Sequence, residues 1–331
     1  MYNTEDLDEL FADDLDIDAS SDGGVSLYEH FRVVADKGQE LVRVDKFLID
    51  HLPHASRNRI QKAAEAGCLH ANGKPVKSNY RVKPRDIITL MMDRPRMNTE
   101  IEPEDIPLDI VYEDDDLMVI NKPAGMPIHP SQGNYDNTLA NACAWYFENK
   151  GEPFTYRCIN RLDRDTTGLL IIARHSYSAS LLSTMVAKRE IHREYRALAT
   201  GLLPEEGTVE APIARVDGST IEREVNFEIG EFARTHYKRL EYKNGYSLAS
   251  LKLDTGRTHQ IRVHMKHIGH PLPGDFLYNP DYSVIQRQAL HSYRLRFRHP
   301  ITGEMLDFTA PIPEDMNQVL QFETATTNEF S

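Results

Sequence analysis

The sequence predicts an α+β fold with a mainly antiparallel mixed sheet, preceded by a small α/β module. Many short apolar or alternating segments, typical of strands, follow one another with only a few helical patterns between them. The chain contains no internal repeat and no glycine-rich nucleotide fingerprint of the kind that marks parallel α/β folds. Its 331 residues, 40% of them hydrophobic, are enough to bury a sizeable core.

The N-terminal module combines two helices and a hairpin. The first helix is predicted from apolar residues at helical spacing: Val44, Phe47, Leu48 and Leu52. It ends at Pro53, and Ser56 is a suitable N-cap for a second helix that stops at Gly67. Asn72-Gly73 predicts a tight hairpin turn, and residues 87–91 predict a further strand.

The larger region supplies most of the strands. They are predicted at residues 117–120, 169–173, 195–199 and 290–297, and on both sides of Asn244-Gly245. Helices are predicted over residues 138–149, 176–189 and 258–267. Residues 94–107 contain three prolines and predict a linker between the two regions.

Charge is distributed unevenly along the chain. The net charge is −13, but residues 1–25 hold nine acidic and no basic residues, and residues 314–331 hold four acidic and none basic. Residues 43–96 contain twelve Lys or Arg against five Asp or Glu, an excess that suits phosphate binding. We expect residues 1–25 to form a disordered acidic tail and residues 316–331 a second acidic tail.

Composition also narrows the compartment and the chemistry. No apolar run reaches the length of a membrane span, and the N-terminus is acidic rather than signal-like, so we expect a cytoplasmic protein. The cysteines are far apart and lack metal-ligand spacing: Cys68, Cys143 and Cys158. They are predicted to be structural thiols in a reducing compartment.

The most informative segment is Arg161-Leu162-Asp163-Arg164-Asp165-Thr166-Thr167-Gly168, which runs into the apolar strand at 169–173. A carboxylate between two arginines, beside a buried strand, needs partners and indicates a functional group. Asp163 is then a candidate nucleophile or base. The structural alternative is a charged surface turn, and this segment taken alone favours neither.

Three more segments decide the interpretation, because all four together resemble the signature of the large-subunit-type RNA pseudouridine synthases. They are Asn121-Lys122-Pro123-Ala124-Gly125-Met126-Pro127-Ile128-His129-Pro130, Arg193-Glu194-Tyr195-Arg196-Ala197, and Thr255-Gly256-Arg257-Thr258-His259-Gln260-Ile261-Arg262-Val263-His264 with Gly269-His270-Pro271 and Gly274-Asp275 after it. The resemblance covers roughly residues 30 to 313. Asn160 departs from it, since the family usually has His before the Arg-Leu-Asp; we expect this to tune the site.

The resemblance implies an RNA uridine isomerase that needs neither a cofactor nor a metal, because the product is an isomer of the substrate. It implies that Asp163, Tyr195 and Arg262 are catalytic and that Arg161 and Arg257 bind RNA. Arg262 is the expected partner of Asp163, although either of the other two arginines remains an alternative. Without the motif, Tyr195 would be interpreted as a half-buried strand aromatic.

The N-terminal module is similar to the alpha-L RNA-binding module first described in a small-subunit ribosomal protein. The similarity rests on Arg43-Val44-Asp45-Lys46-Phe47-Leu48, Ser56-Arg57-Asn58-Arg59-Ile60 and Val76-Lys77. It implies an RNA-binding domain over residues 26–100 and a catalytic domain over residues 101–315. Basic side chains on the module are expected to contact phosphates: Arg57, Arg59, Lys62 and Lys77. Lys122 is a further possible phosphate contact, and the alternative for the module is an ordinary solvated helix face.

The expected substrate is large-subunit ribosomal RNA, because this module accompanies ribosomal specificity in much of the family. Transfer RNA is the nearest alternative. A non-catalytic RNA-binding or ribosome-assembly factor is another, but it would not need Asp163, Tyr195 and Arg262 together. A glycoside hydrolase lacks a second catalytic carboxylate at a recognisable place. Nothing in the sequence requires more than a monomer.

Overall fold

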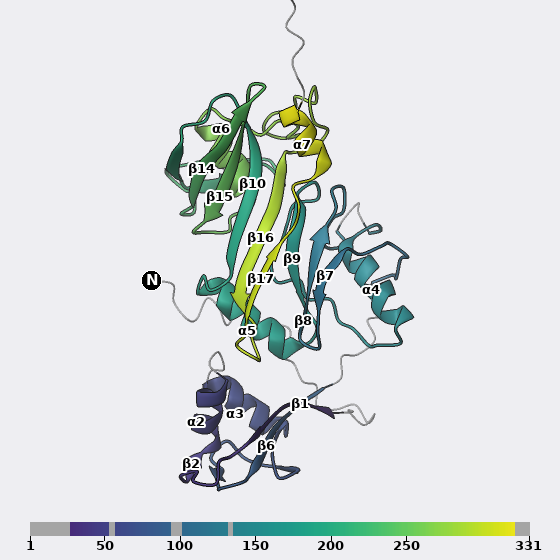
Figure 1. The fold of residues 1–331 in the computed structure, drawn as a ribbon, viewed down its shortest axis with the longest axis vertical. Coiled ribbons are helices and arrows are strands. Elements are labelled where there is room, and N and C mark those ends of the chain that lie inside the picture. The colour runs from purple at the N-terminus through teal and green to yellow at the C-terminus, as the bar shows by residue number, and fades with distance from the viewer. Residues whose placement is uncertain (1–26, 53–56, 94–100, 132–134, 322–331) are drawn as a thin grey trace, which may run out of the picture. The chain divides into compact units, whose positions relative to one another are not determined.

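The computed structural model describes residues 27–52, 57–93, 101–131 and 135–321 (Figure 1). Contacts divide the chain into two compact units. One holds residues up to 45 and residues 58–94, and the other holds residues 46–57 and the residues from 95 onward. The expected tail at residues 1–25 and the expected cap Ser56 lie outside the described residues.

The N-terminal elements follow the predicted order of two helices and a hairpin. They are β1 (Leu27–Val34), β2 (Val42–Arg43), α2 (Val44–His51), α3 (Arg57–Glu65), β3 (Leu69–Ala71), β4 (Lys74–Pro75), β5 (Arg81–Val82) and β6 (Ile87–Asp93). A sheet in the order β1-β6-β3-β4 contains the hairpin, whose turn residues Asn72 and Gly73 both have positive φ. The sequence did not predict β1, which pairs antiparallel with β6.

A nine-stranded sheet dominates the described part of the second unit, in the order β11-β14-β15-β10-β16-β9-β8-β7 with β17 also on β16. Its strands are β7 (Ile110–Glu113), β8 (Leu117–Lys122), β9 (Thr167–Ala173), β10 (His192–Thr200), β11 (Glu206–Glu210), β14 (Arg234–Lys243), β15 (Tyr246–Leu253), β16 (Leu290–Arg298) and β17 (Met305–Thr309). All pairs are antiparallel except β9 with β16. The predicted mainly antiparallel mixed sheet is therefore confirmed.

Helices cover both faces of the sheet, so its central strands read as continuous apolar runs. They are α4 (Leu139–Asn149), α5 (Ser176–Ala187), α6 (Gln260–His267) and α7 (Glu314–Gln321). Alternate residues of β9 serve the two faces: Leu170 and Ile172 pack with residues of α4 and α6, whereas Leu169 and Ile171 pack with residues of α5. None of the described helices has the length and hydropathy of a membrane span.

The C-terminal boundary differs from the expectation. Residues 316–321, which we expected in the acidic tail, belong to α7. Met316, Val319 and Leu320 are buried against Leu198 and Leu248. Val319 and Leu320 follow Met316 by three and four residues, the spacing of one helical face. This pattern is short and lies among acidic residues, so the sequence did not predict the helix.

The two halves of the sheet meet where β9 and β16 run parallel for two residue pairs, His291 with Thr167 and Ser292 with Gly168. Gly168 has φ of +107°, and a Cβ atom there would lie 2.3 Å from the backbone oxygen of Ser292. Only glycine therefore permits the strands to approach so closely. Asp163 precedes this junction by five residues.

Replacing Gly168 with alanine should strain the backbone and force β9 away from β16, lowering the free energy of unfolding by about 3 kcal/mol or more. The single tryptophan of the chain, Trp145 in α4, reports unfolding of this unit by fluorescence. The control is Gly303→Ala, where φ is +72° but nothing lies within 4 Å of the new Cβ, so a loss of about 1 kcal/mol is expected. Equal losses in the two variants would contradict the steric argument.

The same junction predicts a pH dependence of stability. His291 is buried, contacts Thr167 Oγ1 at 2.9 Å, and has its pKa lowered to about 4, mainly by burial. The unfolded chain binds a proton below about pH 6.5 whereas the folded chain resists it, so stability should be lost as pH falls from about 6.5 to about 4. The expected loss is about 3 kcal/mol. Denaturant unfolding of His291→Gln at both pH values should show a loss smaller by that amount, and an unchanged loss would refute the assignment.

Candidate active site

The loop that carries Asp163 is fixed at both ends by hydrogen bonds. Asn160 is buried, and its Oδ1 accepts a hydrogen bond from the amide of Ile171 in β9 at 2.8 Å. The amide of Thr166 donates to the carbonyl of Asp163 at 3.0 Å, which closes a turn. Leu162 is buried in the core, whereas the side chain of Asp163 is 31% exposed. The backbone thus holds Asp163 at the surface of the core with its carboxylate accessible.

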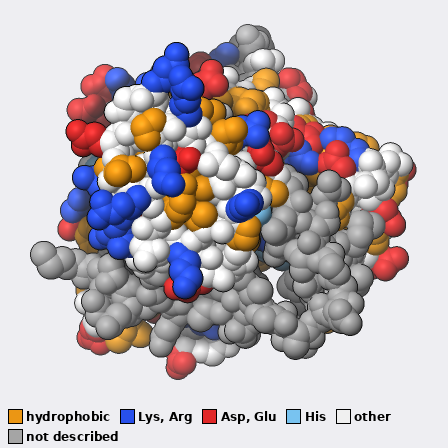
Figure 2. Space-filling model, turned by 90° about the horizontal axis from the view of Figure 1, so that it is seen from below, with side chains coloured by type: hydrophobic (Ala, Val, Ile, Leu, Met, Phe, Trp, Pro, Cys, Tyr) orange, Lys and Arg blue, Asp and Glu red, His pale blue; other side chains and the backbone are white. Residues whose placement is uncertain are grey.

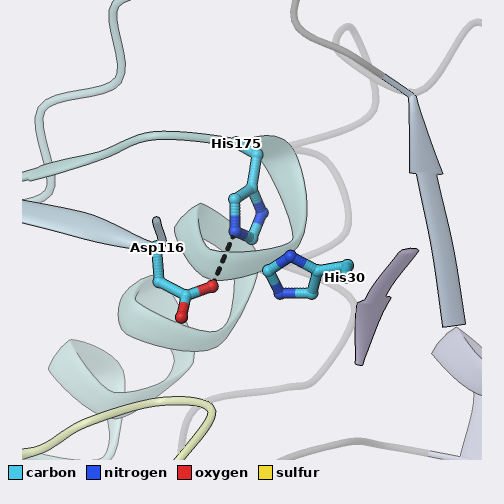
Figure 3. Close-up of side chains that lie close together, drawn as sticks. All are labelled: His30, Asp116 and His175. Atoms are coloured by element: carbon cyan, nitrogen blue, oxygen red, sulfur yellow. Dashed lines mark hydrogen bonds and ion pairs between the residues drawn. The ribbon is translucent and has the colours of Figure 1, made fainter. Parts of the chain in front are cut away.

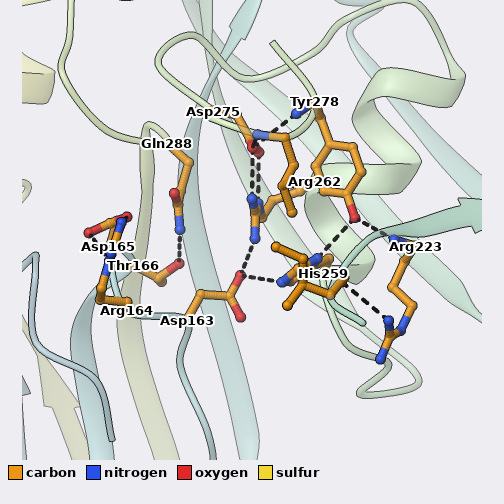
Figure 4. Close-up of polar contacts among 12 residues, drawn as sticks. Asp163, Arg164, Asp165, Thr166, Arg223, His259, Arg262, Asp275, Tyr278 and Gln288 are labelled. Carbon is orange, nitrogen blue, oxygen red and sulfur yellow. Dashed lines mark hydrogen bonds and ion pairs between the residues drawn. The ribbon is translucent and has the colours of Figure 1, made fainter. Parts of the chain in front are cut away.

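Arg262, from α6, is the partner of Asp163 (Figure 4). Its Nη1 donates to Asp163 Oδ2 at 2.8 Å, and its Nε and Nη2 donate to the two oxygens of Asp275, each at 2.7 Å. The guanidinium is 1% exposed and Asp275 is fully buried. Of the three arginines left open by the sequence, Arg262 makes this contact.

A charged guanidinium at this depth requires compensation. Burial alone would lower the pKa of Arg262, but its hydrogen bonds to Asp275 and the charges of Asp163 and Asp275 raise it above its ordinary value. Asp275 also accepts hydrogen bonds from the amides of Leu277 and Tyr278 at 3.1 and 3.2 Å. The sequence alone does not reveal this role of Asp275; the only signal in it is the position of Asp275 in the Gly274-Asp275 motif.

His259 lies on the other side of Asp163. Its Nε2 is 3.9 Å from Asp163 Oδ2, and its Nδ1 lies 2.9 Å from the hydroxyl of Tyr278. That hydroxyl accepts from the amide of Arg223, so its own proton is available to His259 Nδ1. When the Tyr278 hydroxyl donates to Nδ1, the neutral imidazole carries its proton on Nε2, facing Asp163. Burial lowers the pKa of His259, which favours this neutral form.

Lys122 is buried beneath the loop rather than exposed to phosphates. Its Nζ donates to the carbonyls of Pro123, Met126 and Arg164 at 2.7, 3.0 and 2.8 Å. Burial lowers its pKa to about 7, although Asp165 and Asp163 oppose this shift. The idea of Lys122 as a phosphate contact is therefore wrong; it ties the first motif to the loop of Asp163.

A second support comes from the residues just before β16. Arg287 pairs with Asp315 of α7 and donates to the carbonyl of Asp165 at 3.3 Å. Gln288 donates to Thr166 Oγ1 at 3.3 Å (Figure 4). The loop is thus held from three directions, by β8, β9 and the segment entering β16.

Tyr195 lies in β10, 5% exposed, in the same core cluster as Leu162. Within the described parts of the chain, its hydroxyl makes no hydrogen bond to Asp163 or Arg262. Arg161 is exposed beside Asp163. Arg257 is half-buried, pairs with Glu231 and donates through Nε to the carbonyl of Phe232 at 3.2 Å.

The proposed phosphate contacts of the N-terminal elements are only partly described. Arg57 and Lys77 are exposed, whereas the side chains of Arg59 and Lys62 lie outside the described residues. Figure 2 shows one face of the molecule on which Lys and Arg side chains lie among uncharged ones, with Asp and Glu side chains gathered around them. Such a surface suits phosphate contacts that carry little sequence information.

A separate group of buried carboxylates and imidazoles is structural in geometry. His175 Nδ1 accepts from the amide of Ser178 at 3.1 Å, so its Nε2 holds the proton and lies 2.9 Å from Asp116 (Figure 3). His299 accepts at Nδ1 from two amides and faces Asp114 at 2.9 Å. A metal ion could bind Nε2 of either histidine only if that nitrogen lost its proton, and Nδ1 already accepts a hydrogen bond and so is not free to take the proton up. His175 instead caps α5, and His299 caps the turn after β16.

Comparisons with known proteins agree with this geometry. The family model described as RNA pseudouridylate synthase matches residues 116–267, which include Asp163 and Arg262, and the S4 domain model matches residues 42–88. An uncharacterized RNA pseudouridine synthase of Chlorobaculum parvum is 41% identical over 314 residues, covering 86% of this chain and 95% of the relative. The chain belongs to the RNA pseudouridine synthase family.

Two further similarities support this assignment of the synthase. Ribosomal large subunit pseudouridine synthase D of Pasteurella multocida is 38% identical over 297 residues, covering 84% of this chain and 90% of the relative. The solved structure of human RNA pseudouridylate synthase domain containing 1 is 28% identical with a TM-score of 0.52, covering 62% of this chain and 83% of that one. The RNA-binding S4 domain and the catalytic fold that the sequence suggested are both confirmed.

The buried ion pair between Arg262 and Asp275 predicts that loss of its carboxylate destabilises the protein far more than loss of a carboxylate from an exposed pair. Asp275→Asn should leave Arg262 without its bidentate partner and lower the free energy of unfolding by about 3–5 kcal/mol, because an uncompensated buried charge remains. Pseudouridine formation should fall as well, since Arg262 then loses its position against Asp163. Trp145 fluorescence during denaturation measures the first effect.

The matched control is Asp307→Asn, which removes a bidentate arginine pair between Asp307 and Arg294 on the surface. Its stability should be nearly unchanged, because solvent screens exposed pairs. If Asp275→Asn were as stable as this control, the buried ion pair would not be the support described above.

Proposed function

We propose that this synthase isomerises specific uridines of large-subunit ribosomal RNA to pseudouridine, with an aspartate and without a cofactor. The observation that carries the proposal is the Asp163–Arg262 pair at 2.8 Å, inside the segment matched by the family. The relative from Pasteurella multocida, named for the large ribosomal subunit, supports the choice of RNA, because the match covers 90% of its length and includes the S4 domain region.

Asp163 is the proposed catalytic carboxylate. Pseudouridine formation breaks the N-glycosidic bond of uridine, turns the base and rejoins it through C5, so negative charge near C1′ favours departure of the base. Arg262 and His259 both lie on Oδ2, which leaves Oδ1 for the sugar. The carboxylate either attacks C1′ and stabilises its positive character, or starts an elimination from the sugar; both routes need it ionised, which Arg262 favours.

Tyr195 and Arg161 are proposed to handle the base. The target uracil must leave its stack to reach Asp163, at a cost of about a few kcal/mol. Tyr195 then stacks on the uracil and serves as acid or base at C5 or the ribose, and Arg161, exposed beside Asp163, holds the flipped nucleotide. The burial of Tyr195 in the core cluster of Leu162 supports a fixed position for its ring.

The remaining RNA contacts are proposed to be electrostatic. Phosphates are contacted by Arg57, Arg59, Lys62, Lys77 and Arg257. We assign RNA binding to a domain over residues 26–100 and catalysis to a domain that starts at residue 101 and includes α7 (Glu314–Gln321). We also propose that the protein acts as a monomer and that it acts in the cytoplasm, because the proposed function needs neither a second copy nor a membrane.

The test is tritium release from C5-labelled uridine, because the C5 hydrogen leaves when the new bond forms there. Wild-type protein should release tritium from large-subunit ribosomal RNA but not from small-subunit ribosomal RNA or transfer RNA. Asp163→Asn keeps the shape of the side chain and removes its charge, so release should fall by at least about 100-fold.

Asp165→Asn is the matched control, since Asp165 lies on the same loop but pairs with Arg164 at the surface. It should retain most of the activity. Release from transfer RNA instead would change the substrate class, and no release from any of the three RNAs would overturn the proposed function.

A further inference from the structure

Between β11 and β14 the chain makes an excursion beside the active site. It contains β12 (Ile213–Arg215) and β13 (Arg223–Val225), followed by a turn at residues 226–230. Phe227 and Ile229 on this turn are 72% and 74% exposed, the highest values for large hydrophobic side chains among the described residues. Two such side chains on one five-residue turn indicate a contact surface.

The turn is rigid, so its apolar side chains are held outward. Asn226 Oδ1 accepts from the amides of Glu228 and Ile229 at 3.0 and 3.2 Å, and the carbonyl of Asn226 accepts from Gly230 at 3.0 Å. Gly230 lies so close to Pro212 that a Cβ atom there would be 2.8 Å from its backbone carbon. Little conformational entropy is therefore left to lose when a ligand binds.

Both flanks of the turn are attached to the segment that carries His259 and Arg262. On one side, the amide of Arg223 donates to Tyr278, which contacts His259 beside Asp163 (Figure 4). On the other, Arg257 donates to the carbonyl of Phe232 and pairs with Glu231. The ring of Phe227 lies 6.4 Å from that of His267 at the end of α6.

Phe227 lies against the end of the helix that carries Arg262. Arg262 and His267 are five residues apart on α6, about 7.5 Å along its axis. Phe227 and Arg262 are therefore linked through one short helix.

The exposed ring of Phe227 points to a base as the occupant. Charge around the turn is mixed, since Glu222, Glu224 and Glu228 lie near Arg223 and Glu231 pairs with Arg257, so the phosphates attached to that base are not excluded. The π-face of a base stacks on an aromatic ring without needing positive charge. A second copy of the chain is a poorer occupant, because a stable dimer buries about 800 Å² per partner and this patch is two side chains wide.

We propose that turn 226–230 is a stacking platform for an unpaired nucleotide that flanks the target uridine. Phe227 lies against the flanking base, and Ile229 packs against the adjoining base or sugar. Resting on the proposed function, this inference narrows the substrate class: the synthase selects uridines whose neighbours are already unpaired, in loops, bulges or unfolded segments, over uridines inside a duplex.

The first experiment measures binding of a fluorescein-labelled 12-nucleotide oligouridylate and of a 12-base-pair RNA duplex over a series of KCl concentrations. Full-length protein carrying Asp163→Asn is compared with the same protein also carrying Phe227→Ala. Loss of one stacked base should weaken oligouridylate binding by about 5- to 100-fold and leave duplex binding unchanged. The salt dependence should not change, because no phosphate contact is removed.

Two variants serve as controls. Phe227→Trp should restore binding, since indole offers a larger stacking face. Tyr242→Ala removes an exposed aromatic from the far end of β14, about 26 Å along the strand from Arg234, and should bind like the parent. Equal weakening for duplex and single strand, or unchanged binding by Phe227→Ala, would overturn the platform, as would self-association that Phe227→Ala abolishes.

Kinetics separates this inference from the proposed function. With Asp163 intact, Phe227→Ala should raise KM for tritium release from a looped uridine more than it lowers kcat. Absence of release by wild-type protein would overturn the proposed function while the binding experiment still judges the platform. Normal release by wild type with unchanged KM in Phe227→Ala would overturn the platform alone.

Discussion

The architecture of the site depends on the burial of one guanidinium group, that of Arg262. Arg262 is a nearly inaccessible cation, and such a charge is stable only where carboxylates meet it with good geometry. Asp275 satisfies one edge of the guanidinium with two hydrogen bonds, and the remaining Nη1 is thereby aimed at Asp163. A flexible lysine would have no such second edge, so its ammonium would not be oriented by the same partner.

The surroundings of Asp163 follow from the same requirement. The loop can present a carboxylate to Arg262 only if its backbone is held, and Lys122, Asn160 and Gln288 hold it through contacts with Arg164, β9 and Thr166. These groups are themselves buried: Lys122 and Asn160 bond backbone groups, and Gln288 bonds the hydroxyl of Thr166. The loop thus presents Asp163 to solvent, while an extensive polar scaffold lies behind it.

Local patterns revealed much of the fold but less of the site. Helices α2, α4 and α5 and the hairpin at Asn72-Gly73 follow from periodicity and turn residues, since these act over a few positions. Asp163 and Arg262 were found by motif, but their pairing joins residues 99 positions apart and needed coordinates. Asp275 was missed because nothing local distinguishes a buried ligand of arginine. Turn 226–230 was not predicted, because the sequence shows that Phe227 and Ile229 are hydrophobic but not that their side chains are exposed.

The junction between β9 and β16 has a consequence for the synthesis of the protein. Asp163 is translated before β9 and β16 can pair, because Arg262, Asp275 and Ser292 are all translated later. A nascent chain that ends before residue 262 therefore carries Asp163 without Arg262, and one that ends before residue 291 cannot pair β9 with β16. The site is thus completed only after the chain through residue 292 has been translated, because its parts come from segments far apart in the sequence.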